Sequence, residues 1–105
     1  MGRIVISCYR PKAGKDQQLD ELMKTHIDIL RSEGLATARK SIMMKAADGT
    51  IIEVFEWKSK EAIEKAHTNP KVLKMWEEFS QVCDFVKPVD ISEFQNIFSE
   101  FEPVN

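Results

Sequence analysis

Alternation of apolar and polar residues opens the chain. Over Arg3–Tyr9 the side chains divide into two sets with a period of two, as in a β-strand with two different faces. One set is Ile4, Ile6 and Cys8, and the other is Val5, Ser7 and Tyr9. Pro11 and Gly14 follow and favour a turn. The pattern predicts a strand over Arg3–Tyr9.

The pattern then changes to a helical period. Asp16 is a suitable N-cap, and Gly34 is typical of a helix end, so we expect a helix from Asp16 to about Glu33. Residues three and four apart supply an apolar stripe on one face. Its members are Leu19, Leu22, Met23, His26, Ile27 and Leu30.

A hairpin is expected next. Residues 36–47 form a second candidate strand, Asp48-Gly49 is a strong turn signal, and Thr50–Trp57 forms the third strand. In the third strand Ile51, Glu53, Phe55 and Trp57 share one face. The neighbouring positions, including Ile52 and Val54, belong to the other face.

Two linked helices follow the hairpin. Ser59 is a good N-cap for a helix from Lys60 to about Thr68. Asn69-Pro70 then restarts the helix, because proline is well tolerated at the first helical position. We expect the second helix to bury a stripe made of Val72, Leu73, Trp76, Phe79 and Cys83.

The remaining residues complete a β-α-β-β-α-β order. We expect a short fourth strand at Phe85–Val89, one helical turn at Ser92–Gln95 and an extended tail. Residues 1–105 are therefore predicted to form one α+β domain of ferredoxin-like type, with both helices on one face of a four-stranded antiparallel sheet.

The second face of this sheet would keep apolar residues without a cover. A homodimer that packs two sheets face to face, as a dimeric α/β barrel, would bury them. The tail Phe98–Asn105 is expected to pack along the partner subunit, because Phe98 and Phe101 require burial.

Composition narrows the function classes. The chain has 105 residues, 43% hydrophobic content and a net charge of −2, so nothing indicates a nucleic-acid partner bound through phosphates. An RNA-binding sheet is disfavoured as well, since the Lys/Arg-Gly-aromatic signature is absent. No apolar run is long enough for a membrane span or a signal peptide. Cys8 and Cys83 are expected to be buried thiols in a cytoplasmic protein.

Three segments carry a family resemblance: CYRPKAGK, MMKAADGTIIEVFEW and WKSKEAIEKAHTNP. On these segments, and most specifically from Val54 to Trp76, the chain resembles the antibiotic biosynthesis monooxygenase family of dimeric α+β barrels. The ending CDFV and the tail FSEFEP are similar to an uncharacterised bacterial branch of that family. The resemblance implies a pocket between sheet and helices, and oxidation of quinols or anthrones by molecular oxygen without metal, flavin or other cofactor.

Only some of the functional residues of the family are matched in this sequence. Trp57 matches the tryptophan of the anthrone oxygenases, whereas Glu53 stands where those enzymes have asparagine, and Ile63 and Trp76 stand near their tyrosine and arginine. A sister group degrades haem. Its asparagine, tryptophan and histidine would fall at Ser7, Ala66 and Trp76, so haem degradation is not expected.

Glu53 and His67 are the candidate catalytic residues. Glu53 shares its strand face with Phe55 and Trp57, an apolar setting that suits a general base. An alternative is a solvent-facing Glu53 that pairs with Lys40 or Lys45. His67 lies at a helix end, where it would either reach the pocket mouth as a base or interact with the helix dipole.

Five residues are candidates for substrate binding. They are Tyr9, His26, Phe55, Trp57 and Trp76, although each also suits ordinary core packing. The two histidines lie on different elements, so no metal site is predicted. The sequence thus predicts a monooxygenase for a small aromatic substrate. The alternative is a non-catalytic dimeric barrel that binds a small apolar ligand or acts in a stress response.

Overall fold

The computed structural model describes all residues, 1–105, and contains three α-helices packed on an antiparallel sheet. The chain forms β1 (Arg3–Pro11), α1 (Asp16–Ser32), β2 (Ile42–Lys45), β3 (Ile51–Trp57), α2 (Lys60–Ala66), α3 (Pro70–Val82), β4 (Cys83–Val86) and β5 (Glu102–Pro103), with short 3-10 helices at Pro88–Asp90 and Ser92–Gln95. The α+β class and the ferredoxin-like order of the first four strands agree with the expectation. No helix is long and apolar enough to cross a membrane.

The sheet has five strands, in the order β4-β1-β3-β2-β5, rather than the four expected. The fifth strand comes from the tail, whose Glu102 and Pro103 pair with Lys45 and Met44 of β2. Asn105 strengthens this contact, because its side chain accepts a hydrogen bond from the Met43 backbone N–H (2.9 Å) and donates one to the Ser41 carbonyl (3.0 Å). The tail therefore covers an edge of its own sheet.

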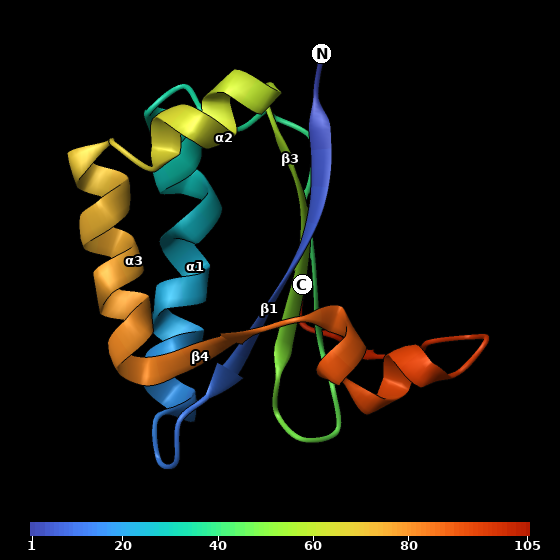
Figure 1. Ribbon diagram of the computed structural model, residues 1–105. Helices are drawn as coiled ribbons and strands as arrows, with labels where there is room; N and C mark the ends of the chain where they lie inside the picture. Colours follow the sequence, from blue (N-terminus) through green and yellow to red (C-terminus); the bar gives the residue numbers. More distant parts are fainter.

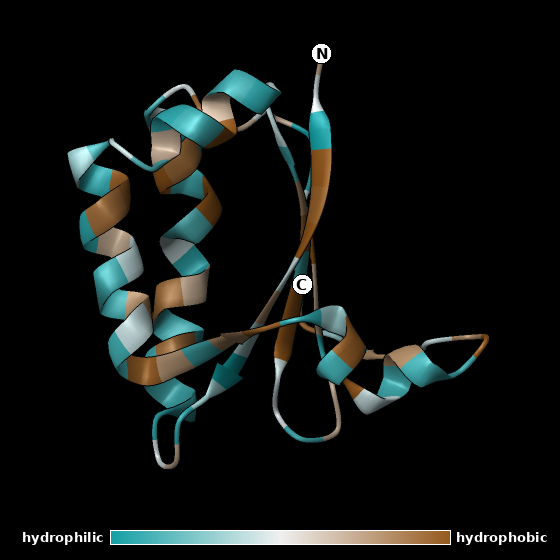
Figure 2. Ribbon diagram, viewed as in Figure 1, coloured by the Kyte–Doolittle hydropathy of each residue, from teal (hydrophilic) through white to brown (hydrophobic).

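All three helices lie on one side of the sheet, with α1 and α3 next to each other (Figure 1). Their buried apolar residues pack with those of the strands in the main core. Figure 2 shows hydrophobic residues recurring as brown segments along α1 and α3. The expected stripe of α1 is confirmed, with Leu22 only half-buried. In α3 the stripe is Val72, Met75 and Phe79, whereas Leu73 is exposed. Positions 72, 75 and 79 follow the three- and four-residue spacing of a buried helix face, which Leu73 does not.

The helix ends show which local signals were correct. Asp16 does not cap α1: it is the first helical residue, and Lys15 occupies the cap position without a side-chain hydrogen bond. Ser59 caps α2 by accepting from the Ala62 N–H (3.0 Å). Asn69 caps α3 by accepting from the N–H groups of Lys71 (2.9 Å) and Val72 (3.1 Å), as predicted.

Glycine ends α1 in a left-handed conformation. Gly34 has φ 73°, a region that side chains other than glycine rarely adopt. Its N–H donates to the Arg31 carbonyl (3.0 Å), and the Leu35 N–H donates to the Leu30 carbonyl (2.9 Å). These two hydrogen bonds together form the Schellman motif, and the buried side chains of Leu30 and Leu35 accompany it.

The second strand is much shorter than predicted. Only Ile42–Lys45 pairs continuously with β3, and Ala36 forms an isolated bridge with Trp57. Between them the strand pairing is interrupted. The Thr37 N–H still donates to the Glu56 carbonyl of β3 (3.0 Å), while the Arg31 guanidinium binds the carbonyl groups of Thr37 (2.8 Å) and Arg39 (2.7 Å). The fourth strand is also displaced: it begins at Cys83, directly after α3, and ends before Pro88.

The C-terminal segment crosses to the face opposite the helices, seen in orange and red in Figure 1. Ile91, Phe94 and Phe101 pack there on a second, smaller core around Cys8 and Ile52. The expectation that Ile52 lacks a cover was therefore wrong. So was the expectation that Phe101 needs a partner subunit for burial, whereas Phe98 does remain exposed.

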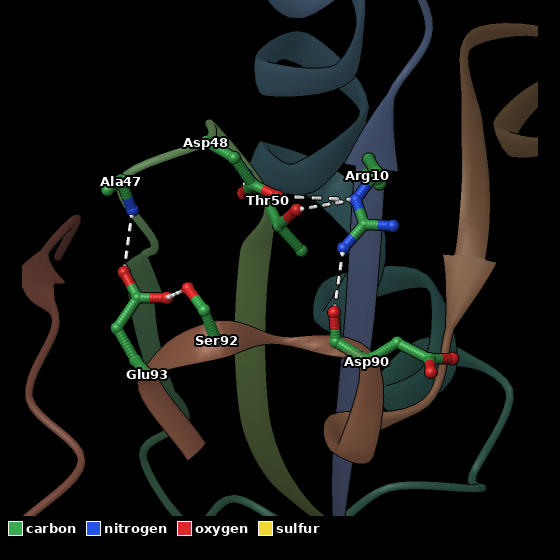
Figure 3. A network of polar contacts seen from close by, with 7 residues as sticks. All are labelled: Arg10, Ala47, Asp48, Thr50, Asp90, Ser92 and Glu93. Carbon is green, nitrogen blue, oxygen red and sulfur yellow. Dashed lines mark hydrogen bonds and ion pairs between the residues drawn. The ribbon is translucent and has the colours of Figure 1, made fainter. Parts of the chain in front are cut away.

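Polar contacts fasten this segment to the β2–β3 hairpin (Figure 3). Arg10 donates to the Thr50 hydroxyl and to the Asp90 carbonyl, both at 3.2 Å, and its Nε lies 3.4 Å from the Asp48 carboxylate. Glu93 accepts from the Ala47 N–H at 2.8 Å. One cation on β1 thus joins the hairpin turn and the start of the C-terminal segment.

Candidate functional site

A pocket of about 300 Å³ opens between the sheet and the helices. Its walls are mostly aromatic and come from β1, β3, β4, α1 and α3. The lining residues are Ser7, Tyr9, His26, Phe55, Trp57, Trp76 and Phe85. An apolar cleft with a few polar groups is the usual form of a small-molecule site.

A larger hollow of about 570 Å³ lies elsewhere, where the tail passes the β2–β3 hairpin. Its lining includes Lys45 and the carboxylates of Glu93, Glu100 and Glu102, of which Glu93 already holds the Ala47 N–H. It has no buried ionisable side chain in its wall. The smaller, aromatic pocket is therefore the better candidate site.

Strand alternation brings the polar residues of the aromatic pocket together. In the β1–β3 register Ser7 lies opposite Glu53, and both strands direct alternate side chains towards the helices. This places Tyr9 of β1 near Glu53 of β3. The apolar stripe of α1 crosses above them and brings in His26, which is the one ionisable member of that stripe.

Glu53 is at the centre of a buried polar cluster. The Tyr9 hydroxyl donates a hydrogen bond to its Oε1 (3.2 Å), and Nδ1 of His26 lies 2.8 Å from the same oxygen. Exposed fractions are 0% for Glu53 and 3% for both His26 and Tyr9. The alternative in which Glu53 faces solvent and pairs with Lys40 or Lys45 is excluded, because Glu53 is fully buried and contacts Tyr9 and His26. Lys45 instead lies 3.9 Å from Asp20.

The contact between His26 and Glu53 is short but poorly aligned. The ring N–H of Nδ1 does not point along the 2.8 Å line to Oε1, so the two groups form a close polar contact without a hydrogen bond of good geometry. Two buried side-chain polar atoms in the chain lack a hydrogen-bond partner, namely Nδ1 of His26 and Oε2 of Glu53. Unsatisfied buried groups are rare in native proteins and require an explanation. Both belong to this pair.

Tyr9 remains a hydrogen-bond donor. Burial raises the pKa of the Tyr9 phenol well above its ordinary value, and the nearby Glu53 carboxyl raises the pKa further. The Ser7 hydroxyl acts in the opposite direction with a smaller effect on the pKa. Tyr9 therefore keeps its proton at physiological pH, and its O–H donates a hydrogen bond to Glu53.

Aromatic rings fix the orientation of His26. The Phe55 ring centroid lies 5.6 Å from that of His26 at an interplanar angle of 88°, and the Phe79 centroid lies 5.4 Å away at 77°. Edge-to-face packing of this kind is favourable. The imidazole therefore has little freedom to turn away from Glu53.

The structure brings together six of the seven predicted site residues: Tyr9, His26, Glu53, Phe55, Trp57 and Trp76. Glu53 lies behind the wall, and the other five line the pocket. His67 is separate: it is exposed at the end of α2, its Nδ1 lies 2.8 Å from the Ile63 carbonyl oxygen, and its ring packs on Trp76. His67 does not line the pocket.

Sequence reasoning missed two lining residues. Ser7 had a usable signal, because it shares a strand face with Tyr9. Phe85 had none, since its place depends on the pairing of β4 with β1, where Phe85 lies opposite Tyr9. No group of three or more His, Cys, Asp or Glu side chains is arranged as a metal site.

Comparison with known proteins shows a likeness in fold and none in sequence family. No family model matches the sequence, and no curated protein matches it significantly. Among solved structures, the fold is similar to that of Rv0793 from Mycobacterium tuberculosis, with a TM-score of 0.63 and 18% sequence identity over 86% of this chain and 97% of that one. At this identity the likeness shows a shared α+β fold and nothing about the function of the pocket.

Proposed function

We propose that this chain is a cofactor-independent monooxygenase of the antibiotic biosynthesis monooxygenase type, acting on a small aromatic quinol or anthrone-like substrate. The aromatic walls formed by Phe55, Trp57 and Trp76 suit a planar ligand. The volume of about 300 Å³ lies at the lower end of the range for ligand pockets and favours a compact ring system.

The proposed reaction requires a base and proceeds without a cofactor. Removal of a proton from an electron-rich hydroxyl leaves an anion that transfers an electron to molecular oxygen. Recombination of the two radicals then forms the carbon–oxygen bond of a peroxide, which takes up a proton and loses water, so that one oxygen atom stays on the substrate. The protein's task is to accept the proton and to keep water away from the anion.

The buried cluster of Tyr9, His26 and Glu53 is the observation that carries this proposal. Burying a carboxylate is costly unless a partner compensates its charge. A pocket that only binds an apolar ligand gains nothing from that cost, whereas a proton-accepting site uses it. This favours catalysis over the alternative of a non-catalytic binding protein.

Oxygen uptake with a panel of hydroquinones and anthrones tests the proposal. We expect at least one compound to consume oxygen faster than without protein, and Glu53→Gln to abolish the difference. Glu64→Gln, on the exposed face of α2, is the matched control and should leave turnover unchanged. Binding of these compounds without any turnover would instead support the non-catalytic alternative.

We also propose a homodimer that packs the two outward sheet faces together. Although the C-terminal segment covers one end of this face, Ile4, Ile6 and Ile42 remain exposed at the other end. Exposed apolar side chains that cluster on a sheet commonly mark an interface. The free, buried thiols of Cys8 and Cys83 support a further proposal, a cytoplasmic location.

A further inference from the structure

We infer that His26 is the group that contacts the substrate, with its Nε2 accepting a phenolic proton, and that Glu53 acts behind it as a positioning residue. The pocket would then hold an acidic phenol as the phenolate, paired with the His26 imidazolium. This inference rests on the proposed function for the location of the ligand, but it requires no oxygen and no turnover.

Accessibility separates the two residues. Glu53 has no exposed surface and is absent from the pocket wall, so its carboxylate cannot touch a ligand. His26 lies in the wall. Its Nε2 makes no hydrogen bond with the protein. Unlike Nδ1, this atom is not fully enclosed. A ligand in the pocket therefore meets the imidazole before it meets the carboxylate.

The position of Glu53 selects the useful tautomer. A carboxylate 2.8 Å from Nδ1 favours the proton on Nδ1, which leaves the lone pair of Nε2 free towards the pocket. The poor alignment of the Nδ1–H bond does not contradict this role, because catalytic hydrogen bonds are often long or bent before a ligand binds. Glu53 therefore prepares His26 to accept a proton.

The proton moves directly from the phenol to His26, with no other reactant. The phenol O–H bond breaks, its electron pair stays on oxygen, and a new N–H bond forms on Nε2. The groups that face His26 are Glu53 of β3 and Tyr9 of β1, with Cys83 near Tyr9 at the start of β4. No lysine or arginine contacts His26, Glu53 or Tyr9, so the imidazolium is the one cation that the carboxylate can meet.

A coloured phenol makes this transfer visible without oxygen chemistry. 4-Nitrophenol absorbs at different wavelengths as phenol and as phenolate, and its methyl ether, 4-nitroanisole, cannot ionise. The titration is run at a pH where the free dye is mainly protonated. The phenolate fraction of the bound dye should then be about tenfold or more above that of the free dye, because an adjacent positive charge stabilises the phenolate. A bound dye that keeps the spectrum of the neutral phenol would overturn the inference.

Matched variants assign the effect to residues. His26→Gln should abolish the phenolate signal and Glu53→Gln should strongly reduce it, while both retain the affinity for 4-nitroanisole, which reports an intact pocket. His67→Gln should change neither reading. Persistence of the phenolate signal in His26→Gln, or its loss in His67→Gln, would refute the assignment.

A measurement on the unmodified protein guards against variants that do not fold. The NMR signals of the His26 ring should show a protonated imidazole when 4-nitrophenol is bound and not when 4-nitroanisole is bound. An unchanged ring would contradict the inference. If dye ionisation occurs but no quinol is oxidised, the monooxygenase proposal fails and this one stands. If a quinol is oxidised but the dye is not ionised, the monooxygenase proposal stands and this inference fails.

Discussion

Nδ1 of His26 and Oε1 of Glu53 lie 2.8 Å apart in the interior of the protein, between a helix and a strand. Almost no surface of either side chain is exposed. A contact between two ionisable groups at this depth affects stability as well as chemistry.

Removal of one member of the pair should therefore be costly. Glu53→Ala leaves His26 without its partner and Tyr9 without an acceptor, and we expect a loss of about 3–5 kcal/mol in the free energy of unfolding. Glu53→Gln keeps the shape and an acceptor oxygen, so its loss should be smaller. Urea denaturation of both variants measures the difference. Equal losses would show that the shape and the acceptor oxygen kept by glutamine contribute little, and that loss of the carboxylate charge accounts for the cost.

Acid stability should depend on Glu56. The hydrogen bond from the Thr37 hydroxyl (2.8 Å) and the contact with Arg39 hold the pKa of the Glu56 carboxyl below its ordinary value. A lowered pKa in the folded state stabilises the protein above the unfolded-state pKa, and that gain is lost as pH falls through the folded-state pKa. Glu56→Gln should thus be less stable than the natural chain at pH 7. The gap should close in strong acid.

Thermal unfolding from neutral to acidic pH measures this gap. Glu64→Gln serves as the control, because the exposed Glu64 carboxylate makes no hydrogen bond within the protein. A gap that stays constant across the acidic range would be inconsistent with the role given to Glu56.

The two helix caps should differ in strength. Ser59 accepts one backbone N–H, whereas Asn69 accepts two and also donates to the Glu33 carboxylate at 3.1 Å. We expect Ser59→Ala to cost about 1 kcal/mol and Asn69→Ala about 2 kcal/mol of unfolding free energy. Chemical denaturation gives both values. The reverse order would show that the Asn69 contacts are weaker than their geometry suggests.

Truncation of the tail should expose one thiol selectively. Burial raises the pKa of the Cys8 thiol, and it raises that of Cys83 to about 11, so both should react slowly with a thiol reagent at pH 8. Phe101 packs over the small core that contains Cys8 and does not belong to the core around Cys83. Deletion of residues 98–105 should accelerate labelling of Cys8 several-fold. Variants with a single cysteine show which thiol reacts, and equal acceleration at both would argue for global loosening.

The dimer should depend on the outward sheet face. Ile6 is 49% exposed on this face, and Ile6→Glu introduces a charge that a packed interface cannot accommodate without cost. We expect light scattering to report a dimer for the natural chain at micromolar concentration and a monomer for Ile6→Glu. Leu73→Glu, on the outer side of α3, is the control. A monomeric natural chain would overturn the dimer proposal.

Local signals predicted most of the fold. The caps Ser59 and Asn69, the Asp48-Gly49 turn and the period-two face of β3 all depend on residues within a few positions of each other. The errors arose where distant contacts decide. The Arg31 side chain of α1 binds the Thr37 and Arg39 carbonyls where a continuous second strand was expected, and the tail becomes a strand only because β2 offers it a free edge.

The sequence by itself determined which residues share a face, because a strand and a helix each have a fixed period. It thus placed Glu53 with Phe55 and Trp57, and His26 in the buried stripe of α1. Only the tertiary structure decided that His26, Tyr9 and Glu53 meet, that Glu53 lies behind the pocket wall, and that His67 lies outside it. The reason is physical: these relationships depend on how α1 packs across two strands, and the spacing of residues along the chain carries no information on that packing.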